Sequence, residues 1–155
     1  SRIEFLHLHF PEYEIFPLDD ASKKIIYQEI CSGQKSWKAI RNQVVLPFLR
    51  AAYQPDQLAT LDDAVPEQID LGNGKRPYRI HYQSDEARIS AYLQDLYDLS
   101  THPAIVHGRH KLLIDILAPN GRSAQLTTDL PSFWNGSYPA IRKELAGRYP
   151  KHEWK

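Results

Sequence analysis

The sequence predicts an α+β fold, with a helical N-terminal lobe followed by a small, mainly antiparallel sheet with two helices. Two observations support this prediction. Apolar residues recur at helical spacing before Pro66, whereas short alternating runs bounded by glycine and proline turns dominate after it. The expected order, helices and then β-β-α-β-β-β-α, is typical of the α+β class. The chain therefore divides into a helical lobe, residues 1–66, and an α+β lobe, residues 67–155.

The helical lobe is expected to hold four helical segments. They cover residues 2–10, 19–30, 36–53 and 54–66. The second segment begins with two aspartates, which favour a helix N-terminus, and places Ile25, Ile26 and Ile30 on one face. Pro47 is expected to bend or break the third segment, because proline lacks an amide hydrogen and clashes with the preceding turn.

The α+β lobe is expected to open with a hairpin and a helix. Residues 67–82 alternate around Gly72-Asn73-Gly74, which is typical of a hairpin turn, and Pro77 suits an edge strand or an irregular entry. Residues 84–99 begin with two candidate N-cap residues and then carry apolar residues at helical spacing. These apolar residues are Ile89, Tyr92, Leu93, Leu96 and Leu99.

The rest of the lobe is expected to hold three short strands and a helix. The strands lie at residues 103–108, 111–121 and 123–129, and the last two are joined by a Pro-Asn-Gly turn. Asp129 is a cap for a short turn, from which a helix begins at about Pro139. Gly147 is expected to end this helix in a left-handed conformation.

Composition limits the class of protein. The 155 residues include a single cysteine, Cys31, which excludes an internal disulfide and fits a reducing compartment. The sequence contains no apolar run of the roughly 20 residues needed to span a bilayer. We therefore expect a soluble, cytoplasmic protein without a membrane span.

The formal net charge of zero conceals an asymmetry along the chain. Residues 1–66 carry 7 basic and 9 acidic side chains and residues 67–141 carry 7 and 8, whereas residues 142–155 carry 5 and 2. The excess of positive charge thus lies in the last tenth of the chain, a milder bias than that of a dedicated nucleic-acid-binding protein.

Motifs for catalysis or cofactor binding are not evident. No closely spaced glycines lead into a lysine and a hydroxyl, as a phosphate-binding loop requires. The pairs His7/His9 and His107/His110 each lack the third ligand of a zinc site. The serines have cap or turn interpretations, and adjacent acidic residues do not converge on a helix. We therefore expect no catalytic residue, no metal and no cofactor in this chain.

A basic and aromatic cluster near the C-terminus is the candidate binding site. Arginine and lysine neutralise phosphates, and tyrosine or tryptophan can stack on unpaired bases. Alternatively, the aromatic residues fold back onto the domain and the cations cover them. The sequence leaves both interpretations open for Arg142, Lys143, Arg148, Tyr149, Lys151, His152 and Trp154.

Residues 129–154 also form a long, specific pattern, DLPSFWNGSYPAIRKELAGRYPKHEW. It combines a Phe-Trp pair, a nearby tyrosine, an Arg-Lys-Glu helix and Gly-Arg-Tyr-Pro-Lys-His-x-Trp. This pattern resembles the C-terminal signature of the HrpB-type ATP-dependent helicases, bacterial members of the DEAH/RHA group. The segment from Leu112 is also similar, and the opening and the hairpin are similar more loosely. The family commonly has a proline after the residue that matches Trp154, whereas this chain has Lys155.

The resemblance implies the C-terminal accessory region of such a helicase. In that family a pair of RecA-like motor domains binds ATP and magnesium, and none of the motor motifs occurs in this sequence. Two functions follow as hypotheses. The region assists binding of single-stranded RNA or DNA, or it is a regulatory module that docks on the motor domains in cis or on a protein partner.

Overall fold

The helices of the N-terminal half begin where the sequence provides caps. The computed structural model describes residues 1–34, 36–41 and 45–155. The helices there are α1 (Arg2–His9), α2 (Asp20–Cys31), α3 (Trp37–Arg41), α4 (Leu46–Arg50) and α5 (Pro55–Ala64), with a 3-10 turn, η1 (Pro11–Tyr13), after α1. The Ser1 hydroxyl accepts from the Glu4 amide at α1, and an Asp19 carboxylate oxygen accepts from the Ser22 amide at α2.

Two predictions about these helices have different outcomes. Pro47 stands in the first turn of α4, which confirms a break between helical segments; residues 42–44 lie outside the described part of the chain. The prediction that three isoleucines share the buried face of α2 is wrong for one of them. Ile26 and Ile30 are buried, but Ile25 is 57% exposed, because neighbouring helical residues point about 100° apart.

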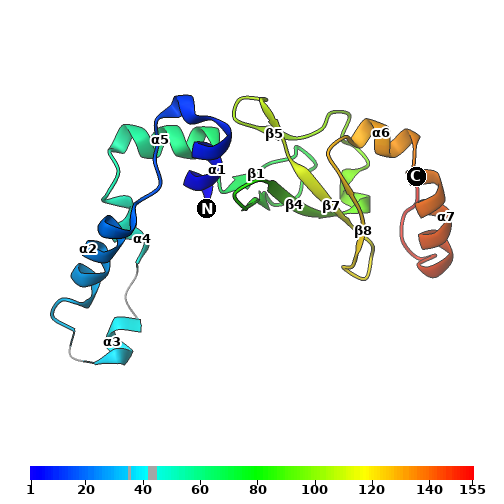
Figure 1. Ribbon diagram of the computed structural model, residues 1–155. Coiled ribbons are helices and arrows are strands. Elements are labelled where there is room, and N and C mark those ends of the chain that lie inside the picture. Colours follow the sequence, from blue (N-terminus) through cyan, green and yellow to red (C-terminus); the bar gives the residue numbers. More distant parts are fainter. Residues whose placement is uncertain (35, 42–44) are drawn as a thin grey trace.

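A four-stranded sheet occupies the middle of the molecule (Figure 1). Its order is β3-β4-β7-β8, with two antiparallel outer pairs and a parallel central pair of five registered residues. The strands are β3 (His81–Tyr82), β4 (Ala87–Tyr92), β7 (Leu113–Leu117) and β8 (Ser123–Thr127). The α+β class is thus confirmed, with a mixed rather than purely antiparallel sheet.

Two short antiparallel ribbons accompany this sheet. The predicted first hairpin is confirmed: β1 (Gln68–Ile69) pairs with β2 (Tyr78–Arg79) across a long loop. The second ribbon pairs β5 (Ala104–Ile105) with β6 (His110–Lys111). The turn between β5 and β6 is left-handed, with φ of 52° at Val106, 53° at His107 and 84° at Gly108.

The predicted helix over residues 84–99 is wrong. The segment forms β4 and then a 3-10 turn, η2 (Leu93–Leu96). In β4, Ala87, Ile89 and Ala91 are buried and alternate with less buried residues, which is the period of a half-buried strand. The apolar residues of η2 follow directly, and their positions relative to those of β4 happen to match the spacing of a helix.

Two helices close the chain, where the sequence predicted a short turn and one helix. They are α6 (Leu130–Asn135), capped by Asp129, and α7 (Tyr138–Arg148). Gly147 does not end α7 in a left-handed conformation, which corrects that prediction. The helix continues to Arg148, and the Tyr149 amide donates to the Leu145 carbonyl at its end.

The main core extends from α1 and α5 through the sheet to α7. Buried residues from the helical lobe, including Phe5, Leu61 and Val65, belong to the same cluster as Ile89 and Ile114 of the sheet. The division into residues 1–66 and 67–155 stays a prediction, and this core crosses it. Within the described ranges, no helix has the length and apolar character needed to cross a membrane.

Candidate nucleic-acid interface

Helix α7 carries the first of the predicted cations and turns a defined face to the protein. Pro139 lies in its first turn, where the missing amide hydrogen leaves no helical bond unmade. Tyr138 and Leu145 are the buried residues of the helix. Because an α-helix turns about 100° per residue, Arg142 and Arg148 flank this buried stripe on opposite sides.

The C-terminal segment, residues 149–155, folds back against α7. The indole Nε1–H of Trp154 donates to the Tyr149 carbonyl at 2.9 Å, and the Arg142 guanidinium donates to the Trp154 carbonyl at 3.4 Å. The hydroxyl of Tyr138 donates to the Lys155 carbonyl. These bonds end on backbone carbonyls of the segment, and one of them depends on the Trp154 side chain.

The same segment is fixed to η2 and the residues after it. The Gln94 amide and the Tyr97 hydroxyl both donate to the Glu153 carbonyl, each at 3.4 Å. The Lys155 ammonium lies 3.4 Å from an Asp98 carboxylate oxygen and 5.7 Å from the centre of the Tyr97 ring. The C-terminal segment is therefore clamped between α7 and η2.

Aromatic rings fill the space beneath this segment. Tyr138 contacts Tyr97, Phe133 and Trp134, with ring centroids 5.0–6.0 Å apart. The Tyr138 oxygen also lies 3.0 Å from the Tyr97 oxygen. Burial raises the pKa of Tyr97 above its ordinary value.

The seven predicted residues separate into an outer and an inner group. Tyr149 and Trp154 are partly buried and pack against the core. The ring of His152 is exposed and lies edge-on to Tyr149, with centroids 6.1 Å apart. The remaining four residues are exposed cations: Arg142, Lys143, Arg148 and Lys151.

The exposed cations differ in how far they are already paired. Arg148 forms an ion pair with Glu144, one turn earlier, at 3.2 Å. Within residues 1–34, 36–41 and 45–155, no carboxylate lies at ion-pair distance from Arg142, Lys143 or Lys151. Three cations are thus available to a negatively charged ligand.

Sequence reasoning missed the residues in and just after η2 that position the C-terminal segment. Gln94, Tyr97 and Asp98 lie in the segment wrongly predicted as a helix, so they gave no signal of their own. Lys155 was counted only as one more charge at the end of the chain. The aromatic pattern around Phe133 and Trp134 was the one signal for packing at this position.

A second unpredicted group is His102, which links the sheet region to α6. Its Nε2 lies 2.6 Å from the Leu112 carbonyl, and its Nδ1 accepts from the Leu130 amide at 3.1 Å. The ring is therefore neutral, with its hydrogen on Nε2. Burial lowers the pKa of His102 below its ordinary value of 6.5.

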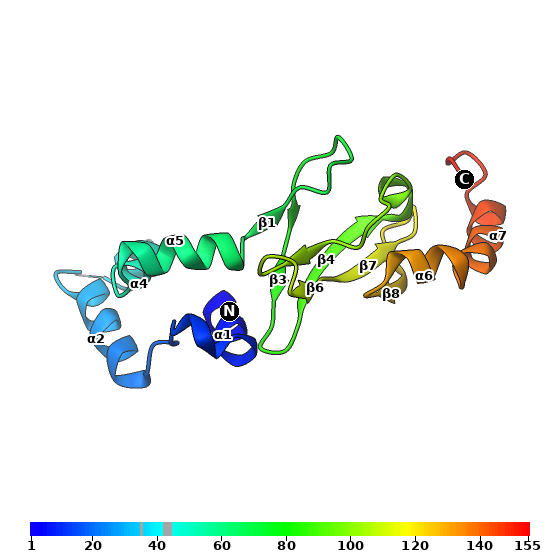
Figure 2. The ribbon, with the colours of Figure 1, turned by 90° about the horizontal axis from the view of Figure 1, so that it is seen from above.

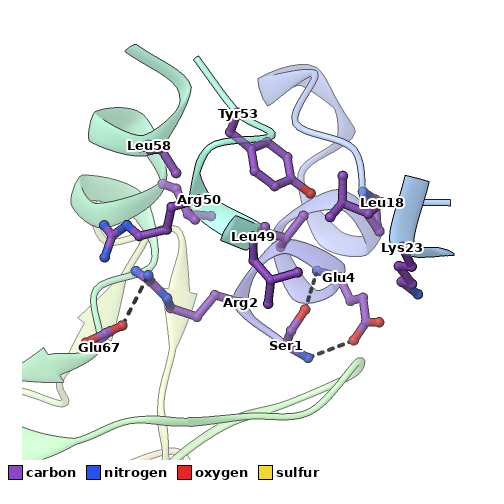
Figure 3. A pocket seen from close by; sticks show the side chains of 13 residues that line it. Ser1, Arg2, Glu4, Leu18, Lys23, Leu49, Arg50, Tyr53, Leu58 and Glu67 are labelled. Carbon is purple, nitrogen blue, oxygen red and sulfur yellow. Dashed lines mark hydrogen bonds and ion pairs between the residues drawn. The ribbon is translucent and has the colours of Figure 1, made fainter. Parts of the chain in front are cut away.

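The helical lobe contains a cavity of about 360 Å³ among α1, α2, α4 and α5 (Figure 3). Its wall is mainly apolar and includes Leu18, Leu49, Tyr53, Leu58 and Leu61. At its edge, the Arg2 guanidinium binds Asp62 at 2.8 Å and Glu67 at 3.3 Å. Because these charges satisfy one another, the cavity suits an apolar group better than an ion.

The histidines of α1 do not assemble a metal site. His9 stacks between Phe5, at a centroid distance of 4.6 Å, and His110, at 5.4 Å. His7 instead lies beside Phe16, at 5.1 Å. Over the part of the chain that the structure describes, no group of three metal-binding side chains converges.

Comparison with known proteins shows the family of the chain. The profile of the family described as "ATP-dependent helicase C-terminal" matches residues 27–155. The chain belongs to this family. It therefore carries the C-terminal domain of an HrpB-type ATP-dependent helicase.

Individual relatives agree with this assignment. The ATP-dependent RNA helicase HrpB of Escherichia coli (strain K12) is 28% identical over 148 residues, which cover 93% of this chain and 18% of that protein. A crystal structure of the E. coli DExH-box NTPase HrpB has a TM-score of 0.85 at 28% identity, and one of the E. coli DEAH/RHA helicase HrpB has 0.73 at 27%. Each match covers 99% of this chain but only 20% of the chain in the crystal structure.

Proposed function

We propose that this chain is a non-catalytic accessory domain that binds the phosphate backbone of nucleic acid for an ATP-dependent helicase. ATP and magnesium would be bound by motor domains in cis, and this chain would require neither. The expected ligand is single-stranded RNA or DNA, in line with the helicase family and with the cations at the C-terminal end.

The observation that carries this proposal is the separation of the basic-aromatic residues into two layers. The Trp154 indole donor is used by the Tyr149 carbonyl, and both rings pack against the core. Arg142, Lys143 and Lys151 face solvent without a carboxylate partner in the described chain. An interface of this kind contacts phosphates and does not stack bases, so we expect affinity that depends on salt and little on base sequence.

Titration with a fluorescent single strand of about 12 nucleotides tests the proposal. We expect binding at low salt with a log-log salt slope that falls by about 0.7 for each phosphate contact removed. Lys143→Ala/Lys151→Ala should therefore weaken binding and flatten the slope. Lys24→Ala/Lys38→Ala removes the same charge from exposed positions of α2 and α3 and is the matched control. Equal effects of the two double variants, or no binding at low salt, would reject the proposal.

A second candidate function, docking onto the motor domains, rests on the surface of the helical lobe. Five large apolar side chains there are more than half exposed: Leu8, Phe16, Ile25, Tyr27 and Trp37. Such exposure over one region is typical of a protein interface. In a protein of the relatives' full length, Ile25→Ser/Trp37→Ser should then change the ATPase rate while leaving the RNA affinity of the 155-residue chain unaltered.

A further inference from the structure

The β1–β2 hairpin carries a second group of exposed cations that the C-terminal signature does not include. Lys75 and Arg76 lie in the loop between the strands, and Arg79 lies in β2; all three are exposed. Figure 2 shows this loop projecting from the body of the molecule on the same edge as the C-terminus. The cations are therefore presented to solvent.

The loop has a defined conformation despite its two glycines. Gly72 and Gly74 adopt φ of 69° and 73°, which a side chain would disfavour. The Asn73 amide donates to the Asp95 carbonyl at 2.9 Å and to the Tyr78 hydroxyl oxygen at 3.1 Å. The loop is thus anchored to η2, so ligand binding would lose little conformational entropy there.

The anchor also determines which side of the hairpin faces η2. The Tyr78 hydroxyl donates to an Asp95 carboxylate oxygen at 3.3 Å, and the Lys75 ammonium lies 3.6 Å from the other oxygen. Successive strand residues point to opposite faces, so Arg79 points away from η2. Arg76 lies in the loop between them and has no carboxylate partner in the described residues.

The hairpin and the C-terminal segment both contact residues 94–98, in and just after η2. Asp95 binds Lys75 of the hairpin, and Asp98 binds Lys155 of the C-terminal segment. Asp95 lies in η2 and Asp98 follows it by three residues, so the two ion pairs are attached to one short stretch of the chain. Lys151 lies within about 14 Å of Lys155 along the backbone, because four residues span at most about 3.6 Å each.

We infer that the β1–β2 hairpin is a second phosphate-binding contact, and that a single nucleic-acid strand runs from it across η2 to the C-terminal segment. This inference rests on the proposed function and extends its site. The acidic groups on this side, Asp95, Asp98 and Glu153, are each within 4 Å of a lysine ammonium. Asp98 and Glu153 share Lys155, and the Asp70 carboxylate at the start of the loop accepts from the Gly72 amide, so the cations left for a strand on this side are Arg76 and Lys151.

The test measures binding of the 155-residue chain to oligouridines of about 4 to about 16 nucleotides, the usual range of single-strand site sizes. Arg76→Ala should reduce the salt slope by about 0.7 for long strands and have much less effect on the shortest, which cannot reach both contacts. Arg79→Ala is the matched control, since it removes the same charge from the opposite face of the same hairpin. Circular dichroism and the thermal midpoint check that each variant is folded.

The outcomes separate this inference from the proposed function. If Lys143→Ala/Lys151→Ala weakens binding while Arg76→Ala behaves as Arg79→Ala, the hairpin contact is rejected and the proposed function stands. If only Arg76→Ala weakens binding, the hairpin binds nucleic acid and the C-terminal contact is rejected. Absence of binding at low salt rejects both. Displacement of the RNA by polyglutamate at equal charge concentration would assign the surface to an acidic protein and overturn the inference.

Discussion

The α+β lobe and helices α2–α4 differ in how they bury their apolar residues. In the sheet region, Ile89, Ile114 and Ile116 are fully buried between the sheet and its flanking segments. In α2–α4, Ile25, Tyr27 and Trp37 are 57–74% exposed. The first region shares the main core with α1 and α5, whereas the second leaves apolar side chains exposed to solvent. The chain therefore combines a well-packed scaffold with an exposed apolar surface.

The largest expected effect comes from the scaffold. Ile114→Ala removes a fully buried side chain from central strand β7 and should lower the free energy of unfolding by about 2–5 kcal/mol. Ile26→Ala in α2 should cost less, because Ile26 lies outside the main core cluster. Denaturant unfolding of both variants measures the difference. Equal losses would show that the two regions unfold as one unit and would break the comparison.

An intermediate effect is expected at the link between the sheet region and α6. His102→Ala removes two hydrogen bonds and should lower the free energy of unfolding by about 1–3 kcal/mol. Since the folded pKa of His102 is lowered, the unfolded state binds the proton more readily, and stability should fall as pH decreases below 6.5.

Urea unfolding between pH 5 and pH 8 checks the contribution of His102. The decrease in stability on acidification should be smaller in His102→Ala than in the wild type. Burial and the neighbouring His9 also lower the pKa of His110. Titration of His110 would account for the decrease in stability that remains in the variant. An unchanged pH dependence in the variant would contradict the conclusion that the His102 ring is neutral and forms two hydrogen bonds.

The smallest effect is expected at the exposed apolar residues. Trp37 is 74% exposed, so Trp37→Ser should change the free energy of unfolding by no more than about 0.5 kcal/mol. The solubility of the variant should also be measured, and it should rise if the Trp37 side chain is exposed apolar surface. A large loss of stability would show instead that Trp37 packs within the lobe.

The sequence predicted elements that carry local signals. The caps at Asp19 and Asp129, the proline at position 47 and the first hairpin were each recognised from one or two residues. The helix predicted over residues 84–99 was wrong because Ala, Ile and Leu fit both periods, and only pairing with β7 selects the strand. That pairing joins residues far apart in the chain, which local patterns do not report.

The sequence predicted which residues make up the candidate site but not how they are arranged in space. The seven basic and aromatic residues were identified from one continuous run, and sequence reasoning left both interpretations of the aromatic rings open. Their separation into an outer and an inner layer depends on Tyr97 and Tyr138, which approach from other elements. The hairpin cations were missed because Lys75 and Arg76 are distant from the C-terminus in sequence, and the two regions are related only through contacts with residues 94–98.

The left-handed turn at Val106 has a consequence for where the molecule can bend. The Val106 amide donates to the Ala64 carbonyl at 2.8 Å, and the His107 ring lies 3.2 Å from an Asp63 carboxylate oxygen, so α5 moves with the sheet. Helices α2–α4 are attached through two neighbouring linkers, residues 14–19 and 51–54, and through the ion pair between Arg50 of α4 and Asp62 of α5 at 3.1 Å. The Tyr53 hydroxyl donates to the Phe16 carbonyl and joins these linkers side by side. Rotation of α2–α4 about this paired hinge would reorient their exposed apolar side chains while the cations around η2 keep their positions.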